Sequence, residues 1–202
     1  RHIALPEMNE VEQRQLFAAV GQTKLMDRYY DFFHEYDIPV GQVLTMKENF
    51  HDQQHRDNQR QCMMAMLRAG VLPIVNENDT VSITELMFTD NDELSGLVAQ
   101  MVEADTLVIL SNVDGLYNGT PGEPGVTVIP EVEPGRSIEE YIQAKKSSAG
   151  RGGMQSKCST AQAVAAAGID VLIANGKRPN ILLDLLLAGG HVTHTHFISN
   201  HH

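Results

Sequence analysis

Short apolar runs of strand length alternate along this chain with longer segments whose apolar residues recur at helical spacing. The apolar runs are Val40–Thr45, Val71–Val75, Thr106–Ser111 and Val171–Ala174. Strands that alternate with helices indicate a mostly parallel sheet, because each helix carries the chain back so that the next strand runs in the same direction. We therefore predict an α/β fold of three layers, in which helices cover both faces of a mostly parallel central sheet.

The helical segments have recognisable starts and ends. A helix that includes Leu94–Val102 is expected to begin at Thr89 or Asp90, since both residue types cap helix N-termini. Gly21 and Gly168 are expected to end two others. We also predict helices over Glu7–Val20, Thr23–Tyr36, Gln53–Ala69, Ser137–Lys145, Ser159–Ala167 and Ile181–Ala188. The histidine-rich end, HVTHTHFISNHH, is expected to be a mobile tail or a purification remnant.

Length and charge limit the kind of protein this is. A chain of 202 residues can form one good-sized core, so one domain is expected. The formal net charge of −11 argues against binding nucleic acid, and any phosphate site must be built locally from backbone N–H groups and a few cations. No apolar run reaches the roughly 18 residues of a membrane span, so we expect a cytoplasmic protein that does not bind membranes. Cys62 is expected to be a buried thiol, and nothing indicates a protein metal site.

Two clusters of acidic and amide residues lie on predicted loops. Asn76–Asp79 follows an apolar strand directly, and Thr89–Glu93 precedes a helix. In open α/β sheets, ligands bind beyond the carboxyl ends of the strands, where such loops lie. The alternative is a pair of ordinary capped turns, because Asn and Asp favour turns for conformational reasons.

A glycine-rich segment, Gly150–Lys157, leads into a predicted helix. Glycines before a helix allow backbone N–H groups to approach an anion closely, which is typical of a phosphate-binding loop. The segment is not a Walker A loop, since Cys158 stands where a Ser or Thr would bind magnesium. Without further information, a flexible connector is the alternative.

Four segments together resemble one group of enzymes. They are NENDTV (76–81), FTDNDELSGLVA (88–99), ILSNVDGLY (109–117) and GRGGMQSK (150–157). They resemble the glutamate 5-kinases of the amino-acid-kinase family, and the resemblance runs from about Gln15 to about Phe197. It implies the amino-acid-kinase fold and ATP-dependent phosphorylation of the γ-carboxylate of L-glutamate to γ-glutamyl phosphate, the first step of proline biosynthesis.

The resemblance also implies roles for individual residues. Asp92 would orient lysines over the transferring phosphoryl group, and Lys157 would be one of those lysines. Glutamate would be held by Asp79 and Asn91, with Asn76 as a weaker candidate, since a carboxylate accepts from its ammonium and an amide donates to its carboxylate. The nucleotide would lie along Ser111, Asn112, Arg151, Gly152, Gly153, Met154 and Lys157.

The cofactors implied are ATP and Mg²⁺, with the metal bridging the β- and γ-phosphates and keeping several waters. Two departures from the family pattern change the charge around the nucleotide. The family often has Thr-Asp in place of Ser111-Asn112, and it usually has Thr in place of Arg151. The resemblance further implies a homo-oligomer, a dimer or a tetramer, and proline as a candidate feedback inhibitor.

Two family patterns do not occur before Glu7: a first strand with a Gly-rich turn and a second catalytic lysine, and a later Ser-Ser-Gly-Ala loop. We therefore expect residues 1–202 to be an N-terminally incomplete amino-acid-kinase domain, without the RNA-binding-like domain that some members add. Three alternatives stay open. One is a non-catalytic member that binds nucleotide or amino acid, and another is a kinase of another small carboxylate or of carbamate. The third is the kinase half of a fused two-step enzyme, which would need a reductase domain downstream of His202.

Overall fold

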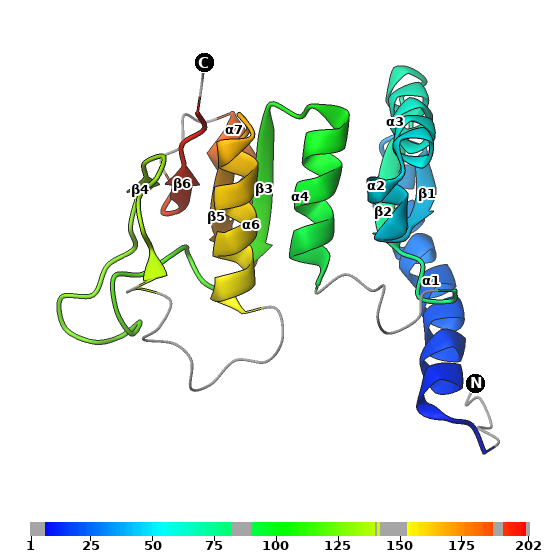
Figure 1. Cartoon of the computed structure of the whole chain (residues 1–202), viewed down its shortest axis with the longest axis horizontal. Coiled ribbons are helices and arrows are strands. Elements are labelled where there is room, and N and C mark those ends of the chain that lie inside the picture. Colours follow the sequence, from blue (N-terminus) through cyan, green and yellow to red (C-terminus); the bar gives the residue numbers. More distant parts are fainter. Residues whose placement is uncertain (1–6, 82–89, 140, 142–152, 188–191, 201–202) are drawn as a thin grey trace. The chain divides into compact units, whose positions relative to one another are not determined.

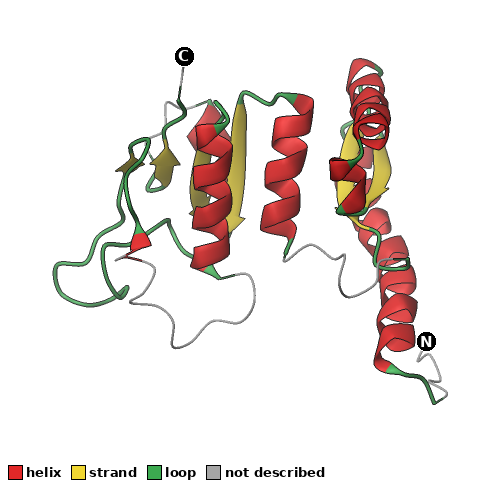
Figure 2. Cartoon of the chain, in the orientation of Figure 1, coloured by secondary structure: helices red, strands yellow, loops and turns green. Residues whose placement is uncertain are grey.

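The computed structural model describes residues 7–81, 90–139, 141, 153–187 and 192–200. The chain divides into two compact units, Arg1–Phe88 (unit 1) and Thr89–His202 (unit 2). Figure 1 labels the elements of both units, and Figure 2 shows that helices and strands occur in each. Over the described ranges, no helix combines the length and the apolar character needed to cross a membrane.

Unit 1 begins with one long helix, α1 (Glu10–His34). The Asn9 side chain accepts a hydrogen bond from the Glu12 backbone N–H, and the Glu12 carboxylate accepts one from the Asn9 N–H, both at 2.9 Å. This reciprocal capping box fixes the start of the helix. The prediction of two helices separated at Gly21 is wrong. A glycine inside a helix costs only about 1 kcal/mol relative to alanine, too little to break an otherwise continuous helix.

The sheet of unit 1 has two parallel strands, β1 (Val40–Thr45) and β2 (Leu72–Glu77). The chain passes between them through α2 (Glu48–His51) and α3 (Gln53–Arg68). The bounds of β1 agree with the prediction. β2 continues two residues further than predicted, because Asn76 and Glu77 still pair with β1. Cys62, predicted to be buried, is exposed on α3.

Unit 2 contains a four-stranded sheet in the order β3-β5-β6-β4. β3 (Thr106–Ser111) and β5 (Asp170–Asn175) are parallel, as are β4 (Glu131–Val132) and β6 (Thr195–Phe197), whereas β5 and β6 are antiparallel. The prediction of mostly parallel strands is confirmed.

β6 shows that the prediction of a mobile tail is wrong for this part of the chain. Thr195 is fully buried, accepts a hydrogen bond from the Leu116 N–H at 2.8 Å and donates one to the Ile129 carbonyl at 2.7 Å. Phe197 is 1% exposed and belongs to the main core cluster. The predicted helix Ser137–Lys145 lies mostly outside the described residues.

Unit 2 has helices on both faces of its sheet. Val171 and Ile173 of β5 share a core cluster with buried residues of α4 (Asn91–Val102) and α6 (Met154–Ala166). The alternate residue Ala174 packs with α7 (Ile181–Leu186) instead. Successive side chains of a strand point to opposite faces, so α4 and α6 cover one face and α7 covers the other. The predicted three layers are present in unit 2, and α7 ends near its predicted position.

Candidate functional site

One edge of unit 2 gathers most of the polar segments that the sequence singled out. β3 and β5 are parallel neighbours, so their carboxyl ends lie at the same edge. α4 precedes β3, α6 precedes β5, and both helices run opposite to the strands, which brings their N-termini to that edge as well (Figure 1). This is the edge where open α/β sheets bind ligands.

An ion pair joins the two helices at this edge. The Lys157 ammonium on α6 lies 2.6 Å from the Asp92 carboxylate on α4, and the two side chains are 17% and 14% exposed. Asp92 lies in the first turn of α4, whose N-cap is Asp90, one of the two caps predicted. The Asp90 carboxylate accepts from the Glu93 N–H at 3.0 Å, and this cap fixes the turn that presents Asp92. The structure thus brings together the two residues expected to act in catalysis.

Close packing of α4 on α6 sets the separation of that pair. A Cβ atom on Gly96 of α4 would lie 2.7 Å from Cγ2 of Thr160 and 3.0 Å from Cγ2 of Val164 on α6. Both distances are too short for carbon atoms, so the helices approach this closely because residue 96 has no side chain. Gly96 lies one turn from Asp92, and Thr160 lies one turn from Lys157, so this contact fixes the backbone positions from which the two side chains extend.

The expected nucleotide residues are at the same edge where the structure describes them. Ser111 ends β3, Asn112 follows it, Gly153 is the N-cap of α6, and Met154 is the first residue of that helix. Arg151 and Gly152 lie outside the described residues. The helix starts at Met154 rather than at the predicted Ser159, so Lys157 is itself helical. The N–H groups of Ser156 and Lys157 donate to the Gly153 carbonyl at 3.1 and 3.4 Å. The first N–H groups of a helix, here those of Met154 and Gln155, point out of its end, which makes that end suitable for an anion.

The residues expected to bind glutamate are divided between the units. Asn76 is the penultimate residue of β2 in unit 1, not part of a loop as predicted, and its amide donates to the Gln22 side chain on α1 at 3.0 Å. Asn91 is the first residue of α4 in unit 2. Asp79 and Asn76 line one small cavity of about 160 Å³ in unit 1, with Ala18, Gly21, Gln22, Leu25, Leu44, Glu77, Asn78 and Thr80.

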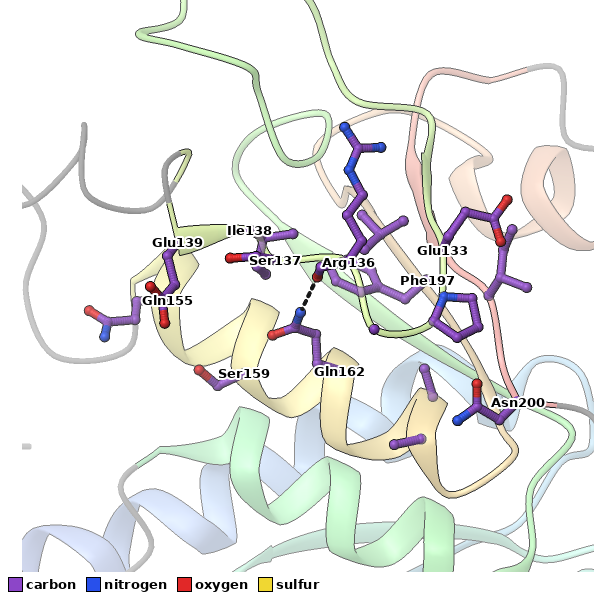
Figure 3. Close-up of a pocket in the computed structure, with 16 residues that line it drawn as sticks. Glu133, Arg136, Ser137, Ile138, Glu139, Gln155, Ser159, Gln162, Phe197 and Asn200 are labelled. Carbon is purple, nitrogen blue, oxygen red and sulfur yellow. Dashed lines mark hydrogen bonds between the residues drawn. The ribbon is translucent and has the colours of Figure 1, made fainter.

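Unit 2 also contains a larger cavity of about 650 Å³, which Figure 3 shows between the 132–139 segment and α6. None of the predicted site residues lines it. Gln155, Ser159 and Gln162 line it from α6, whereas Lys157 is about half a helical turn away from that face. The cavity and the Asp92–Lys157 pair therefore occupy different sides of the same helix.

Sequence reasoning missed a second polar cluster at the carboxyl edge, centred on Asp114. Its carboxylate accepts from the Asn175 amide at 3.1 Å, from Arg178 Nε at 3.0 Å and from the Tyr117 hydroxyl at 3.1 Å. Burial raises the pKa of the Asp114 carboxyl, but these hydrogen bonds and the arginine charge outweigh burial, so its pKa lies below its usual value. Burial and the bond to this carboxylate raise the pKa of Tyr117. The sequence did contain a signal for this cluster, because polar residues follow both of the predicted strands Thr106–Ser111 and Val171–Ala174.

The described residues include oxygen atoms that suit a hydrated metal ion, but these are not grouped into a protein cage. In the described part of the chain, no three His, Cys, Asp or Glu side chains are grouped to hold a metal. The Oδ2 atom of Asp90 is buried with no hydrogen-bond partner among the described residues. A free carboxylate oxygen suits Mg²⁺, which binds few protein ligands and otherwise keeps water and substrate phosphates.

The comparison with known proteins identifies relatives along almost the whole sequence. The profile of the amino acid kinase family matches residues 2–175. A glutamate 5-kinase of Bacteroides thetaiotaomicron is 59% identical over 192 residues, which are 95% of this chain and 53% of that protein. One of Chlorobaculum tepidum is 49% identical over 183 residues, which are 90% of this chain and 50% of that protein. The chain spans about half the length of these two curated relatives.

Solved structures agree on the fold. Carbamate kinase from Giardia lamblia bound to AMP-PNP superposes with a TM-score of 0.53 at 19% identity, covering 70% of this chain and 45% of that one. Similarity at this identity concerns the fold alone. Together with the family match, it confirms the predicted amino-acid-kinase-like α/β fold.

Proposed function

This chain belongs to the amino acid kinase family, and we propose that its protein transfers the γ-phosphoryl group of ATP to the γ-carboxylate of L-glutamate. The product is γ-glutamyl phosphate, and the reaction is the first step of proline biosynthesis. Identity of 59% to a glutamate 5-kinase over 95% of this chain supports the choice of acceptor.

The observation that carries the proposal is the ion pair between Asp92 and Lys157. A γ-carboxylate is already ionised at neutral pH, so attack on phosphorus needs no general base. A carboxylate oxygen forms the new bond to the γ-phosphorus, the bond to the β–γ bridging oxygen breaks, and ADP leaves. Catalysis then depends on positioning and on neutralising charge on the phosphoryl oxygens. Lys157 supplies that charge, and Asp92 orients its ammonium.

The glutamate would be bound by Asp79, Asn91 and Asn76. Asp79 supplies an acceptor for the substrate ammonium, and the amides of Asn91 and Asn76 supply donors for carboxylate oxygens. Asn76 is pre-oriented by its bond to Gln22, which reduces the conformational entropy lost on binding. The cavity of unit 1 that Asn76 and Asp79 line supports their common role.

ATP would bind along Ser111, Asn112, Gly153 and Met154, with Arg151 and Gly152 completing the glycine-rich loop. Binding of AMP-PNP, an ATP analogue, by the Giardia lamblia carbamate kinase is consistent with this cofactor. Mg²⁺ would be held mainly by the β- and γ-phosphates, with the Asp90 carboxylate accepting a hydrogen bond from a metal-bound water. When bound, the ion neutralises charge on the phosphates.

The remaining partners belong to the same proposal. A cytoplasmic homo-oligomer is expected, and the exposed aromatic side chains of α1 support a subunit interface. Tyr30, Phe32 and Tyr36, on or beside α1, are 56%, 67% and 71% exposed. Proline is a candidate inhibitor because it shares the α-carboxylate and the ammonium of glutamate.

The test is the acceptor requirement of ADP release by the complete protein. We expect ADP release with L-glutamate but not with L-aspartate or carbamate. Added hydroxylamine should trap an equal amount of hydroxamate, because an acyl phosphate reacts with it. ADP release with carbamate in place of glutamate would overturn the choice of substrate. ATP binding without turnover on any of these acceptors would favour the non-catalytic alternative.

A further inference from the structure

The Asp114 cluster ties together two loops that leave neighbouring strands. Asp114 follows β3, Asn175 is the last residue of β5, and Arg178 follows β5. The contacts of Asp114 with these two residues therefore span 61 and 64 residues of sequence. A further bond from the Gly176 N–H to the Ser111 carbonyl, at 2.8 Å, joins the same two loops. The loop after β5 is thereby held beside Ser111, one of the residues expected to contact the nucleotide.

The Arg178 side chain is accessible to a ligand, but its guanidinium is held at Nε. Its side chain is 42% exposed, whereas that of Asp114 is 24% exposed. In the described part of the chain, the carboxylate binds the guanidinium through Nε, the nitrogen nearest the backbone. A guanidinium held in this way still has its two Nη groups, whose planar fork matches the oxygens of a phosphate.

The negative charge of the chain means that a nucleotide site at this edge needs local cations. A chain with a formal net charge of −11 repels a nucleotide polyphosphate unless cations are placed locally. Lys157 is one such cation, but the Asp92 carboxylate neutralises much of its charge before ATP binds. A second cation beside the nucleotide loop would offset the negative charge of the triphosphate.

We propose that Arg178 binds a phosphate group of the nucleotide and that Asp114 is the positioning residue that holds its guanidinium for this purpose. The inference rests on the proposed use of ATP but not on the identity of the acceptor. Asp114 acts only through Arg178, so removing the carboxylate should matter less than removing the arginine and should not matter once the arginine is gone.

The experiment measures the dissociation constant of ATP by calorimetry on the complete protein without any acceptor. Arg178→Gln should weaken ATP binding about tenfold or more, the scale of a lost hydrogen bond to a charged group. Asp114→Asn should weaken it by a smaller factor, and the double variant should match Arg178→Gln. Arg178→Lys, which keeps the charge without the fork, should fall between wild type and Arg178→Gln. Arg136→Gln, an arginine of the separate cavity, should bind ATP as wild type does.

Three results would overturn the proposal. One is ATP binding by Arg178→Gln within about twofold of wild type. Another is a double variant whose loss is the product of the single losses, which would mean that Asp114 acts independently of Arg178. The third concerns adenosine, which has no phosphate and whose affinity is measured by competition with a fluorescent ADP analogue. If Arg178→Gln weakened adenosine binding by the same factor as ATP binding, the arginine would not act on a phosphate. The binding assay contains no acceptor, so its outcome does not depend on whether the protein phosphorylates glutamate. The two proposals can therefore fail separately.

Discussion

The two units of this chain hold their parts of the candidate site in different ways. In unit 2, α6 buries Cys158, Ala161, Val164 and Ala165 within 13 residues, and Lys157 projects from that anchored helix. In unit 1, α1 has no buried residue over its 25 residues, and the residues that the structure describes there form a sheet of two strands. The proposed catalytic pair is therefore built on a packed core, whereas Asn76 and Asp79 are built on a smaller framework.

The two proposed tasks require different precision. Stabilising a transition state depends on donors held in place before reaction, so small displacements are costly. Binding a substrate in its ground state tolerates adjustment, and loosely packed regions are suited to it. We therefore expect changes in unit 2 to affect the rate of phosphoryl transfer and changes in unit 1 to affect the affinity for glutamate.

The largest effect is expected at the ion pair. Lys157→Ala should lower kcat by about 10²–10³, the range found when one preorganised donor is lost. Asp92→Asn keeps the shape of the side chain but removes the charge that orients the lysine. The double variant should be little slower than Lys157→Ala, because residues that act as one device are not additive. The measurement is the steady-state kcat of the two single variants and the double variant. If the loss of kcat in the double variant equals the product of the single losses, the two residues act separately.

In unit 1, Asp79→Ala should raise the KM for glutamate about tenfold or more, as expected for one hydrogen bond to a charged group. Neither kcat nor the KM for ATP should change comparably. Asp27, an exposed residue of α1, provides the control, and Asp27→Ala should leave all three constants at wild-type values. An unchanged glutamate KM in Asp79→Ala would remove Asp79 from the binding site.

A packing change in unit 2 should produce an intermediate loss of rate. Gly96→Ala would force α4 away from α6 at Thr160, and overpacking of this kind costs about 1–3 kcal/mol. Because the contact controls the Asp92–Lys157 separation, we expect kcat to fall about tenfold, which corresponds to about 1.4 kcal/mol in the activation barrier.

Adding Thr160→Ala removes the methyl group that Gly96→Ala would strike, so the double variant should recover most of the rate and of the thermal stability. The single and double variants are compared by kcat and melting temperature. A double variant no better than Gly96→Ala would show that the added Cβ does not act through the Thr160 methyl group.

The smallest effect, a change in stability, is expected at Asp170, at the amino end of β5. Burial raises the pKa of Asp170, but bonds from Ser199 and the proximity of His196 outweigh it, so its pKa lies below the usual value. A carboxyl whose folded pKa is lowered adds stability above its unfolded pKa, and that stability is lost as pH falls through the folded pKa. Asp170→Asn should cost about 0.5–1 kcal/mol at pH 7.

The stability gap between wild type and Asp170→Asn should close as pH falls below about 4, the ordinary pKa of an aspartate. Urea unfolding of both proteins over this pH range measures the gap. A gap that stays constant to acidic pH would mean that the Asp170 charge contributes nothing.

The sequence was sufficient for elements that follow the apolar pattern. The bounds of β1 and β3 were predicted correctly because continuous apolar runs mark buried strands. β6 was missed because it has three residues and places Thr195 in the core, where two hydrogen bonds satisfy the hydroxyl. Burial of a threonine in this way leaves no apolar signal.

The candidate site was predictable to the extent that it follows local motifs. Asp92 and Lys157 were identified from the segments around them, although 65 residues separate them. The Asp114 cluster was missed because its partners come from another strand and no local pattern links them. The role of Gly96 depends on the distance between two helices, which a sequence does not specify.

The division of labour between the units is tested most directly by raising the glutamate concentration. The rate of hydroxamate formation at saturating ATP is measured for wild type, Asp79→Ala and Lys157→Ala. Asp79→Ala should approach the wild-type maximal rate at high glutamate, whereas Lys157→Ala should stay about 10²–10³-fold slower at every concentration. Recovery of Lys157→Ala by glutamate, or a maximal rate of Asp79→Ala as low as that of Lys157→Ala, would contradict the account.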